Sequence, residues 1–430
     1  MVLSISNQLT LEKLTSPKFQ IIKLPSGLTL VHQQVSTSPV VVTDVWIDAG
    51  VTNEPDSWSG IAHFLEHMIF KGTTNVLPGE FDYVVENNGG FANAATSYDY
   101  AHFFLVTASQ YLPQTLPYLG EILLQATIPD EEFYLERDVV LEEIRSSDDD
   151  YDWLALQALA DLIYQNHPYG RSVLGDGELL LHNTPNQMRC FHKTHYQPER
   201  MSVVLVGDIT EKDAISLVED SFSNFTVRSE CPPVNLDGEP PIVDIRRKQL
   251  FLPRSEMSKI IMGWSGPGID NFEGAIALDL ISMILTGGRS SRLIKKLREE
   301  KQLVLDISCD FSLQKHSSLF TISAYFYPQY LTEIENIIRQ EIYNLQTKPI
   351  TDKEMTVCQK TLIHDYIFST ETPEQLAGLY GYYQTLKNAQ LSFKYPQIVH
   401  SLTPRQIQCY ASQYLSPQYY CVCEVHEQCS

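Results

Sequence analysis

Two histidines four positions apart, with a glutamate between them, form the strongest chemical signal in the chain. His63, Glu66 and His67 lie in the run GIAHFLEHMIFKGT. On a helix, residues four apart share one face, so the two imidazoles can bind one metal ion. The order H-x-x-E-H inverts the commoner H-E-x-x-H zinc motif. The neighbouring residues are apolar, and burying polar groups without a partner is costly. The pattern therefore predicts a metal site with a carboxylate placed to accept a proton.

A catalytic zinc site usually has three protein ligands, so a third ligand is expected on another helix. The stretch PDEEFYLERDVVLEEIRS predicts a helix that starts after Pro129, because its first turn is acidic. Glu136 and Glu143 are seven residues apart in it, which places them on one face. A carboxylate there could complete a His-His-Glu set. Taken alone, the segment is more typical of an ordinary acidic amphipathic helix.

The chain resembles the pitrilysin/insulinase-type zinc peptidases, which include the mitochondrial processing peptidases and their bacterial relatives. The resemblance rests on HFLEHM-x-FKGT, GGFANAATSYDY, ERDVVLEEI and GGRSSRLIKKLREEKQLV, in that order. It implies one zinc ion per chain, bound by His63, His67 and Glu143, which follows His67 by 76 residues. It also implies that Glu66 is the general base and that Glu136 is an auxiliary catalytic glutamate.

Two further motifs bear on substrate binding. GGFANAATSYDYAHFFLV predicts a strand entered through a Gly-Gly turn. The resemblance implies that a peptide substrate pairs with this strand near Asn93 and Ala94, so affinity comes from the peptide main chain. In LREEKQLVL, Arg298 matches a substrate-holding arginine of the family. Leu305 stands where the family's active pattern has a tyrosine, and leucine offers no donor to an oxyanion.

The missing tyrosine bears on partners. Some relatives divide the work between two similar chains, one with the zinc site and one with the Arg/Tyr pair. We therefore expect a second similar subunit, either a zinc-less relative in a heterodimer or the same chain in a homodimer. The implied function is a zinc-dependent endopeptidase that cleaves extended, unfolded peptides or presequence-like segments inside a closed chamber. The alternative is a non-catalytic scaffold subunit of the same fold, which would have no need of intact ligands and base.

Composition limits the other partners. The net charge of -22 argues against nucleic acid. The acidic surface would attract basic peptides or serve only to keep the protein in solution. No segment approaches 18 consecutive apolar residues, so no membrane span is expected. The first 30 residues contain neither a secretory signal nor a typical transit peptide, which favours a cytoplasmic protein.

The chain repeats itself weakly. Trp46 in VVTDVWIDAG matches Trp264 in KIIMGWSGPG at an offset of 218, and Tyr196 matches Tyr414 at the same offset. The run RSECPPVNLDGEPP between the repeats is rich in proline and predicts a linker. The expected units are a zinc-bearing catalytic half over 1–228, a linker over 229–241, and a homologous metal-free half over 242–430 that shapes the chamber and holds substrate.

Short strands and long helices favour an α+β fold. We expect two homologous α/β halves, each a mostly antiparallel sheet with helices packed on one face. The second-half segment that corresponds to the HFLEH helix reads EGAIALDLISMIL and contains no histidine. Metal is therefore expected in the first half alone. Cys421, Cys423, His426 and Cys429 do not form a standard zinc pattern, and the eight cysteines are expected to be reduced thiols.

Overall fold

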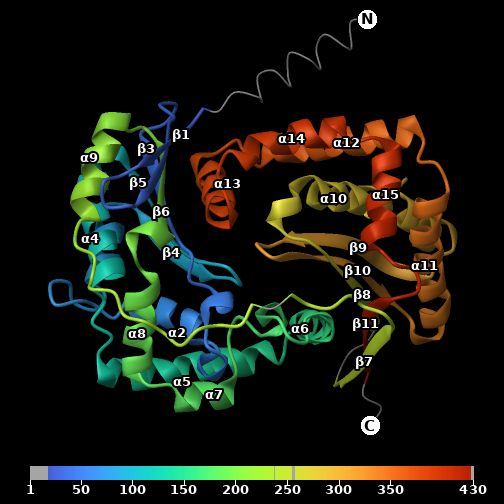
Figure 1. Ribbon diagram of the computed structural model, residues 1–430, viewed down its shortest axis with the longest axis horizontal. Coiled ribbons are helices and arrows are strands. Elements are labelled where there is room, and N and C mark those ends of the chain that lie inside the picture. Colours follow the sequence, from blue (N-terminus) through green and yellow to red (C-terminus); the bar gives the residue numbers. More distant parts are fainter. Residues whose placement is uncertain (1–17, 237, 254–256, 428–430) are drawn as a thin grey trace, which may run out of the picture.

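The computed structural model describes residues 18–236, 238–253 and 257–427, which form two sheets flanked by helices (Figure 1). The first sheet has the strand order β1-β2-β6-β3-β5-β4, and the second has the order β7-β11-β8-β10-β9. The strands are β1 (Gln20–Lys23), β2 (Thr29–Gln34), β3 (Val40–Ile47), β4 (Phe91–Thr96), β5 (Ala101–Ala108), β6 (Met201–Gly207), β7 (Ile245–Leu252), β8 (Ser258–Pro267), β9 (Val304–Leu313), β10 (Ser317–Phe326) and β11 (Tyr420–Glu427).

The helices follow the same division. Those before the linker are α2 (Ile61–Ile69), α3 (Glu80–Asn87), α4 (Leu112–Gln125), α5 (Asp130–Ser147), α6 (Tyr151–Ile163), α7 (Gly177–His182), α8 (Pro185–His195) and α9 (Glu211–Ser221). Those after it are α10 (Phe272–Thr286), α11 (Leu331–Thr347), α12 (Asp352–Phe368), α13 (Pro373–Leu386), α14 (Leu391–Ser401) and α15 (Pro404–Tyr414).

The internal repeat is visible in the strand register. In each sheet one pair is parallel, β2 with β6 and β7 with β11, and all other pairs are antiparallel. Trp46 on β3 lies opposite His102, and Trp264 on β8 lies opposite Phe320. The two tryptophans differ by 218 in number, and so do the two residues opposite them. The prediction of two homologous halves with mostly antiparallel sheets is confirmed.

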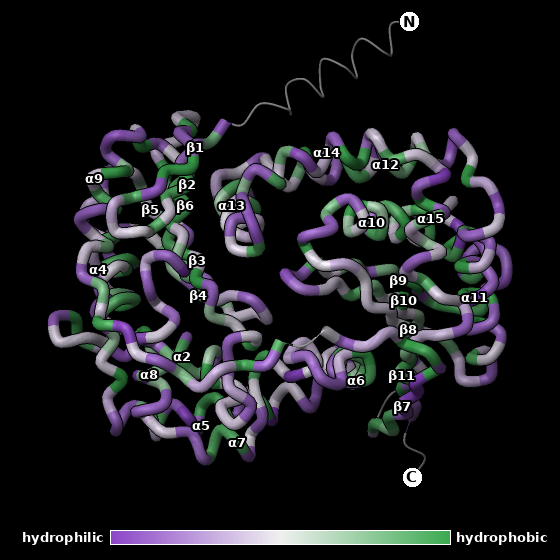
Figure 2. Tube along the Cα trace, in the orientation of Figure 1, coloured by the Kyte–Doolittle hydropathy of each residue, from purple (hydrophilic) through white to green (hydrophobic). Residues whose placement is uncertain are grey.

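Alternate residues of each central strand face opposite layers, because side chains alternate along a strand. Val41 and Val45 on β3 belong to the core under the first half's own helices. Val42 and Trp46 belong to a separate core with Ala377 of α13. The helices differ in hydropathy as well. Figure 2 shows hydrophobic segments along α10 and polar segments along α5.

The halves exchange one helix each. Helix α13 of the second half packs on β3 and β6, and α6 of the first half packs on β8 and β11. Gly381 of α13 lies against the indole of Trp46 so closely that a Cβ atom would clash with it. The expectation of helices on one sheet face is therefore incomplete, because each second face is covered by a helix from the other half. The linker in the sequence therefore separates the two sheets, but the helices that cover each sheet come from both sides of the linker.

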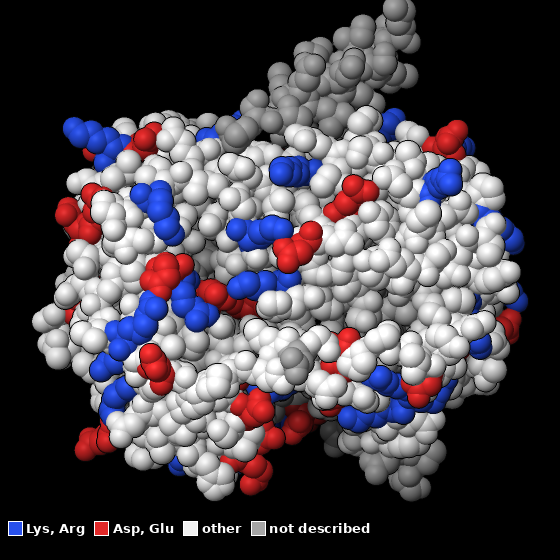
Figure 3. All heavy atoms as spheres, viewed as in Figure 1, with Lys and Arg blue, Asp and Glu red and all other residues white. Residues whose placement is uncertain are grey.

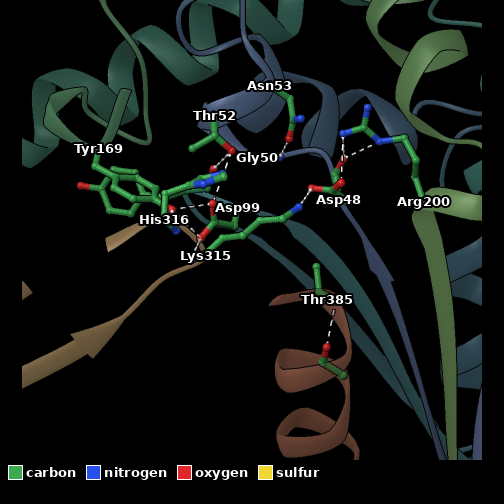
Figure 4. A network of polar contacts seen from close by, with 12 residues as sticks. Asp48, Gly50, Thr52, Asn53, Asp99, Tyr169, Arg200, Lys315, His316 and Thr385 are labelled. Carbon is green, nitrogen blue, oxygen red and sulfur yellow. Dashed lines mark hydrogen bonds and ion pairs between the residues drawn. The ribbon is translucent and has the colours of Figure 1, made fainter. Parts of the chain in front are cut away.

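A polar network also joins the halves at the tip of the β9–β10 hairpin (Figure 4). The buried carboxylate of Asp99 accepts hydrogen bonds from the Lys315 main-chain N–H and the Tyr169 hydroxyl, both at 2.9 Å. The Lys315 ammonium lies 3.4 Å from the carboxylate of Asp48. Because Asp99 accepts from both halves at once, the hairpin is held in one position against the first half.

The segment between α9 and β7 contains no helix or strand in its described residues, and the predicted linker 229–241 falls within it. No described helix combines the length and apolar character needed to cross a membrane. Figure 3 shows acidic and basic side chains interspersed on one face of the molecule. The cytoplasmic location stays a prediction, and residues 1–17, on which it partly rests, lie outside the described part of the chain.

Candidate metal centre

Helix α2 holds the HFLEH motif at a position set by a buried carboxyl group. The Glu54 carboxylate accepts hydrogen bonds from the N–H groups of Gly60 (3.0 Å) and Ala62 (2.8 Å), which are otherwise unpaired at a helix start. Burial raises the pKa of Glu54 to about 8, although these two hydrogen bonds act to lower it. Gly60 adopts φ of 87°, and its Cα packs against Gly175. The sequence analysis missed Glu54, which stands nine residues before the first histidine.

The three predicted ligands come together where α2 meets α5. The Nε2 atoms of His63 and His67 lie 3.7 Å and 3.5 Å from the same Oε2 atom of Glu143. Zinc bonds of about 2.0–2.2 Å in a tetrahedron place ligand atoms roughly 3.3–3.6 Å apart. Among the described residues this is the one group of three or more side chains whose ligand atoms could hold a metal ion. The donor set and its spacing therefore fit zinc.

The protonation of the site suits metal binding. His63 is 7% exposed, and burial together with the neighbouring His67 lowers its pKa to about 4. Neutral imidazole is the form that binds zinc, so His63 needs no deprotonation near neutral pH. Glu143 has a side chain that is 44% exposed, which leaves one side of the site open to a substrate.

Glu136 lies behind the site rather than among the ligand atoms. Its Oε1 atom is 3.0 Å from Nδ1 of His67, and its Oε2 atom is 2.5 Å from the Lys71 ammonium. Burial acts to raise the pKa of Glu136, but the hydrogen bonds from Lys71 and His67 lower it below its usual value. An ionised Glu136 holds the proton of His67 on Nδ1 and leaves Nε2 free to face Glu143.

Glu66 faces the end of strand β4. The Thr96 hydroxyl donates a hydrogen bond of 2.6 Å to its Oε2 atom. Burial raises the pKa of Glu66, while the Thr96 hydrogen bond acts in the opposite direction. A carboxyl with a raised pKa is better matched to exchanging protons near neutral pH. Thr96 and Lys71 were both missed as site residues, although both lie inside the quoted motifs and Lys71 follows His67 by one helical turn.

The segment predicted as one strand over 89–106 is a hairpin. A turn closed by the hydrogen bond from Ser97 N–H to the Tyr100 carbonyl separates β4 from β5. Strand β4 stands last in its sheet. The Asn93 side chain is exposed and accepts a hydrogen bond from the Ala94 N–H at 2.9 Å, whereas Ala94 packs against the core. The outer edge of β4 is therefore open to an additional strand.

Arg298 is not joined to this group. It lies in the helical segment Ile294–Glu300, where its guanidinium contacts Glu299 at 3.2 Å and Asp306 at 3.4 Å. Leu305 lies on β9, and its side chain is 48% exposed. Both residues belong to the second half. Neither is among the side chains that form the metal centre in the described chain.

The cysteine-rich C-terminal run provides no second centre among the residues described. Cys421 and Cys423 are buried on β11 and belong to the core between α6 and the second sheet. Cys429 lies outside the described residues. The seven described cysteines are all free thiols.

Two family models match the chain over consecutive stretches. The model for insulinase (peptidase family M16) matches residues 29–177, which include the metal centre. The model for the peptidase M16 inactive domain matches residues 183–362. The second match begins inside the first half, because it includes β6 of the first sheet, so the predicted boundaries of the two halves stay a prediction.

Curated relatives match over most of their length. The zinc protease PqqE of Helicobacter pylori is 28% identical over 378 residues, which cover 87% of this chain and 85% of that protein. An uncharacterized zinc protease of Mycobacterium leprae is 26% identical over 412 residues, covering 92% and 89%. An uncharacterized zinc protease of Bacillus subtilis, YmxG, is 26% identical and covers 81% and 83%.

Solved structures share the whole arrangement. The crystal structure of a protease from Helicobacter pylori superposes with a TM-score of 0.87 at 26% identity, covering 95% of this chain and 99% of that one. A peptidase M16 inactive domain from Pseudomonas fluorescens superposes with a TM-score of 0.85 at 18% identity, covering 96% and 99%. The second likeness concerns the fold alone.

Proposed function

The chain belongs to the insulinase-type (M16) zinc peptidase family, and we propose that it is an active zinc-dependent endopeptidase with one zinc ion per chain. Its substrates would be extended, unfolded peptides or presequence-like segments, cleaved inside a closed chamber. The observation that supports this most directly is the approach of two imidazole Nε2 atoms to one carboxylate oxygen of Glu143, at 3.7 Å and 3.5 Å. Glu66, the proposed general base, lies close to His67 and Glu143 but is not one of the proposed ligands.

Each residue of the centre has a separate task in peptide hydrolysis. Zinc bound by His63, His67 and Glu143 would polarise a peptide carbonyl and lower the pKa of a water. Glu66 accepts a proton from the attacking water and delivers it to the departing amine. Thr96 orients the Glu66 carboxylate through its hydrogen bond of 2.6 Å.

Substrate orientation would come from the sheet. A peptide that pairs with the open edge of β4 near Asn93 and Ala94 becomes a further strand, held by its main chain. Because Thr96 at the end of β4 hydrogen-bonds to Glu66, the added strand would be placed in register with the base. A folded protein does not present such a free strand, so the site would select unfolded segments.

The chamber and the substrate-holding role of Arg298 require a second subunit of similar fold. We propose a heterodimer with a zinc-less relative that has the Arg/Tyr pair, because Leu305 lacks a hydroxyl. A homodimer that relies on Arg298 and main-chain donors is the alternative arrangement. Light scattering on the purified chain, with peptide assays before and after adding similar proteins of its source, distinguishes them. A fully active homodimer that no partner improves would reject the heterodimer.

The activity itself is tested on the purified chain and any such partner. Zinc is measured by atomic emission after dialysis, and cleavage is followed with an unstructured fluorogenic peptide. We expect stoichiometric zinc, turnover that chelation abolishes, and no cleavage of a stably folded protein. Stoichiometric zinc without turnover under every subunit combination would instead support the non-catalytic scaffold.

A further inference from the structure

The second half contains an aromatic pocket with a carboxylate in its wall. The pocket has a volume of about 170 Å³ and lies where α10, β9, α13 and α14 meet. Its aromatic lining is formed by Phe272, Phe311, Tyr382, Tyr383 and Tyr395. The one ionisable acid in the lining is Asp279 of α10. A cavity of about 150 Å³ is enough to hold a benzene molecule, so a side-chain-sized ligand fits.

Asp279 has one polar partner in this pocket, and that partner is neutral. The Tyr395 hydroxyl donates a hydrogen bond to its Oδ2 atom. No ion pair joins Asp279 to a Lys, Arg or His in the part of the chain that the structure describes. Burial raises its pKa to about 6, the Tyr395 hydrogen bond acts to lower it, and the charge of Asp365 raises it further. The pocket therefore contains a carboxyl group whose one side-chain partner is a neutral hydroxyl and which has no cation partner among the described residues.

The internal repeat shows that this carboxylate is not required by the fold. At the offset of 218, Asp279 corresponds to Ile61, which is fully buried in the first half. An apolar residue, the first of α2, thus stands at the matching position of the repeat in the other half. A carboxylate in an aromatic wall without a cation partner costs free energy that an isoleucine would not cost. Its presence points to a ligand that compensates it.

We propose that the Asp279 pocket binds an organic cation of the alkylammonium or guanidinium class, such as the side chain of a lysine or arginine. The carboxylate supplies the opposite charge, and the rings of Phe311 and Tyr382 supply faces that attract cations. A hydrophobic stem of three or four methylene groups packs on the remaining aromatic wall. A neutral ligand of the same shape gains only the apolar part of this interaction.

The position of the pocket links it to the rest of the molecule. The Tyr382 ring lies 6.2 Å from the Tyr100 ring of the first half, and its hydroxyl donates to the Leu313 carbonyl at 2.5 Å. Tyr100 directly precedes β5, the strand beside β4. One wall of the pocket is therefore continuous with the junction between the halves. The cation site does not depend on the proposed peptidase activity, but assigning the cation to a peptide substrate does.

The test compares two probes that differ in charge. Binding of N-acetyl-lysine methylamide and N-acetyl-norleucine methylamide to the full chain is titrated by saturation-transfer NMR. We expect the lysine derivative to bind at least about tenfold more tightly, which is the effect of one charged hydrogen bond. Equal binding of the two probes would overturn the proposal. The readout needs no turnover, so it stays informative if the chain is not a peptidase.

Variants locate the binding. Asp279→Asn keeps the size and the acceptor for Tyr395, and it should abolish the preference for the lysine derivative. Asp365→Asn removes the exposed neighbouring charge and should retain the preference. Phe311→Leu keeps the carboxylate and should reduce the preference roughly threefold by removing one ring face. A preference that survives Asp279→Asn in folded protein would place the cation elsewhere and reject the pocket.

Two further measurements identify the source of the cation. If the cation is a substrate side chain, Asp279→Asn should raise KM for a lysine-containing peptide, leave kcat nearly unchanged, and leave the norleucine peptide unaffected. If the cation is a free amine, the variant should leave both KM values unchanged, and n-butylammonium should alter turnover of the norleucine peptide by the wild-type chain alone. Either result supports the site and assigns its ligand.

Discussion

The two halves share the order of five strands, with β1 as an additional edge strand of the first sheet, but the corresponding helices α2 and α10 have opposite chemistry. At the offset of 218, His63, Glu66 and His67 correspond to Ile281, Ile284 and Leu285. These three apolar residues are at most 1% exposed and belong to the second core. One scaffold thus supports either a polar centre or a closed apolar core at the same place.

The difference between the helices is supported by their neighbours. In the first half, His67 and Glu66 each have a hydrogen-bond partner from another element, on α5 and at the end of β4, and Nε2 of His63 faces Glu143 of α5 at 3.7 Å. In the second half, apolar side chains need no such partners, and the helix is buried almost throughout its length. The comparison teaches that the fold supplies positions, while the chemistry depends on a few side chains and their partners.

The largest effect is expected when the two histidines of α2 are replaced by the residues at the matching positions of α10. The double variant His63→Ile with His67→Leu removes two of the three proposed ligands, so bound zinc and peptide turnover should both disappear. The apo protein should remain folded, because the second half shows that these side chains suit the helix. Atomic emission after dialysis and a circular dichroism melt measure both effects. Retained stoichiometric zinc would show that the metal is bound elsewhere.

Removing only the base sharpens the comparison. Glu66→Gln leaves all three ligands in place, so zinc should stay stoichiometric. Turnover should fall at least ~100-fold, because a positioned base contributes that much to proton transfer. Steady-state cleavage of the fluorogenic peptide, normalised to bound zinc, measures the loss. Wild-type turnover by this variant would contradict the role assigned to Glu66.

The two glutamates of α5 should differ in kind. Glu143→Gln removes a ligand and should strip most zinc during dialysis. Glu136→Gln disturbs only the partner of His67, so most zinc should remain while metal affinity or turnover falls about 10–100-fold. Zinc titration with a competing chelator separates the two variants. Equal zinc loss in both would show that the ligand and the auxiliary residue are wrongly assigned.

The smallest effect tests whether the halves are one cooperative unit. Leu159 of α6 is fully buried against the sheet of the other half, so Leu159→Ala should cost about 2–5 kcal/mol of unfolding free energy. The exposed Leu156 on the same helix is a matched control, and Leu156→Ala should change stability by roughly 0.5 kcal/mol or less. Denaturant unfolding should give a single transition in each case. Two separate transitions would show that the exchanged helices do not couple the halves.

Much of the candidate site was predictable because the motif is local. A spacing of four on one helix places His63 and His67 on one face whatever surrounds the helix. The start of α5 after Pro129 was predicted correctly from its acidic first turn. The choice between Glu136 and Glu143 was not available from spacing, since both lie on one face. The family resemblance named Glu143, and the structure places its carboxylate, rather than that of Glu136, at the two Nε2 atoms.

Other parts could not be predicted because they depend on contacts between distant segments. The segment over 89–106 was predicted as one strand, since the alternation of its residues continues across the turn at 97–100. The structure shows that Ser97 and Tyr98 end β4 by accepting hydrogen bonds at the start of the 51–53 turn. Glu54 was missed because an acidic residue in a loop has no periodic pattern, and only its burial reveals its role.

The sequence by itself predicted the cluster of His63, His67 and Glu143, the repeat and the α+β class. Side-chain type and helical periodicity are properties of short segments, so they survive without knowledge of the fold. Only the tertiary structure decided that α6 and α13 each pack on the sheet of the other half. It also decided that Glu136 contacts Nδ1 of His67 and that Asp279 lies in an aromatic pocket. Each of these depends on packing between elements that are distant in the sequence, such as His67 and Glu136, and no local pattern encodes that packing.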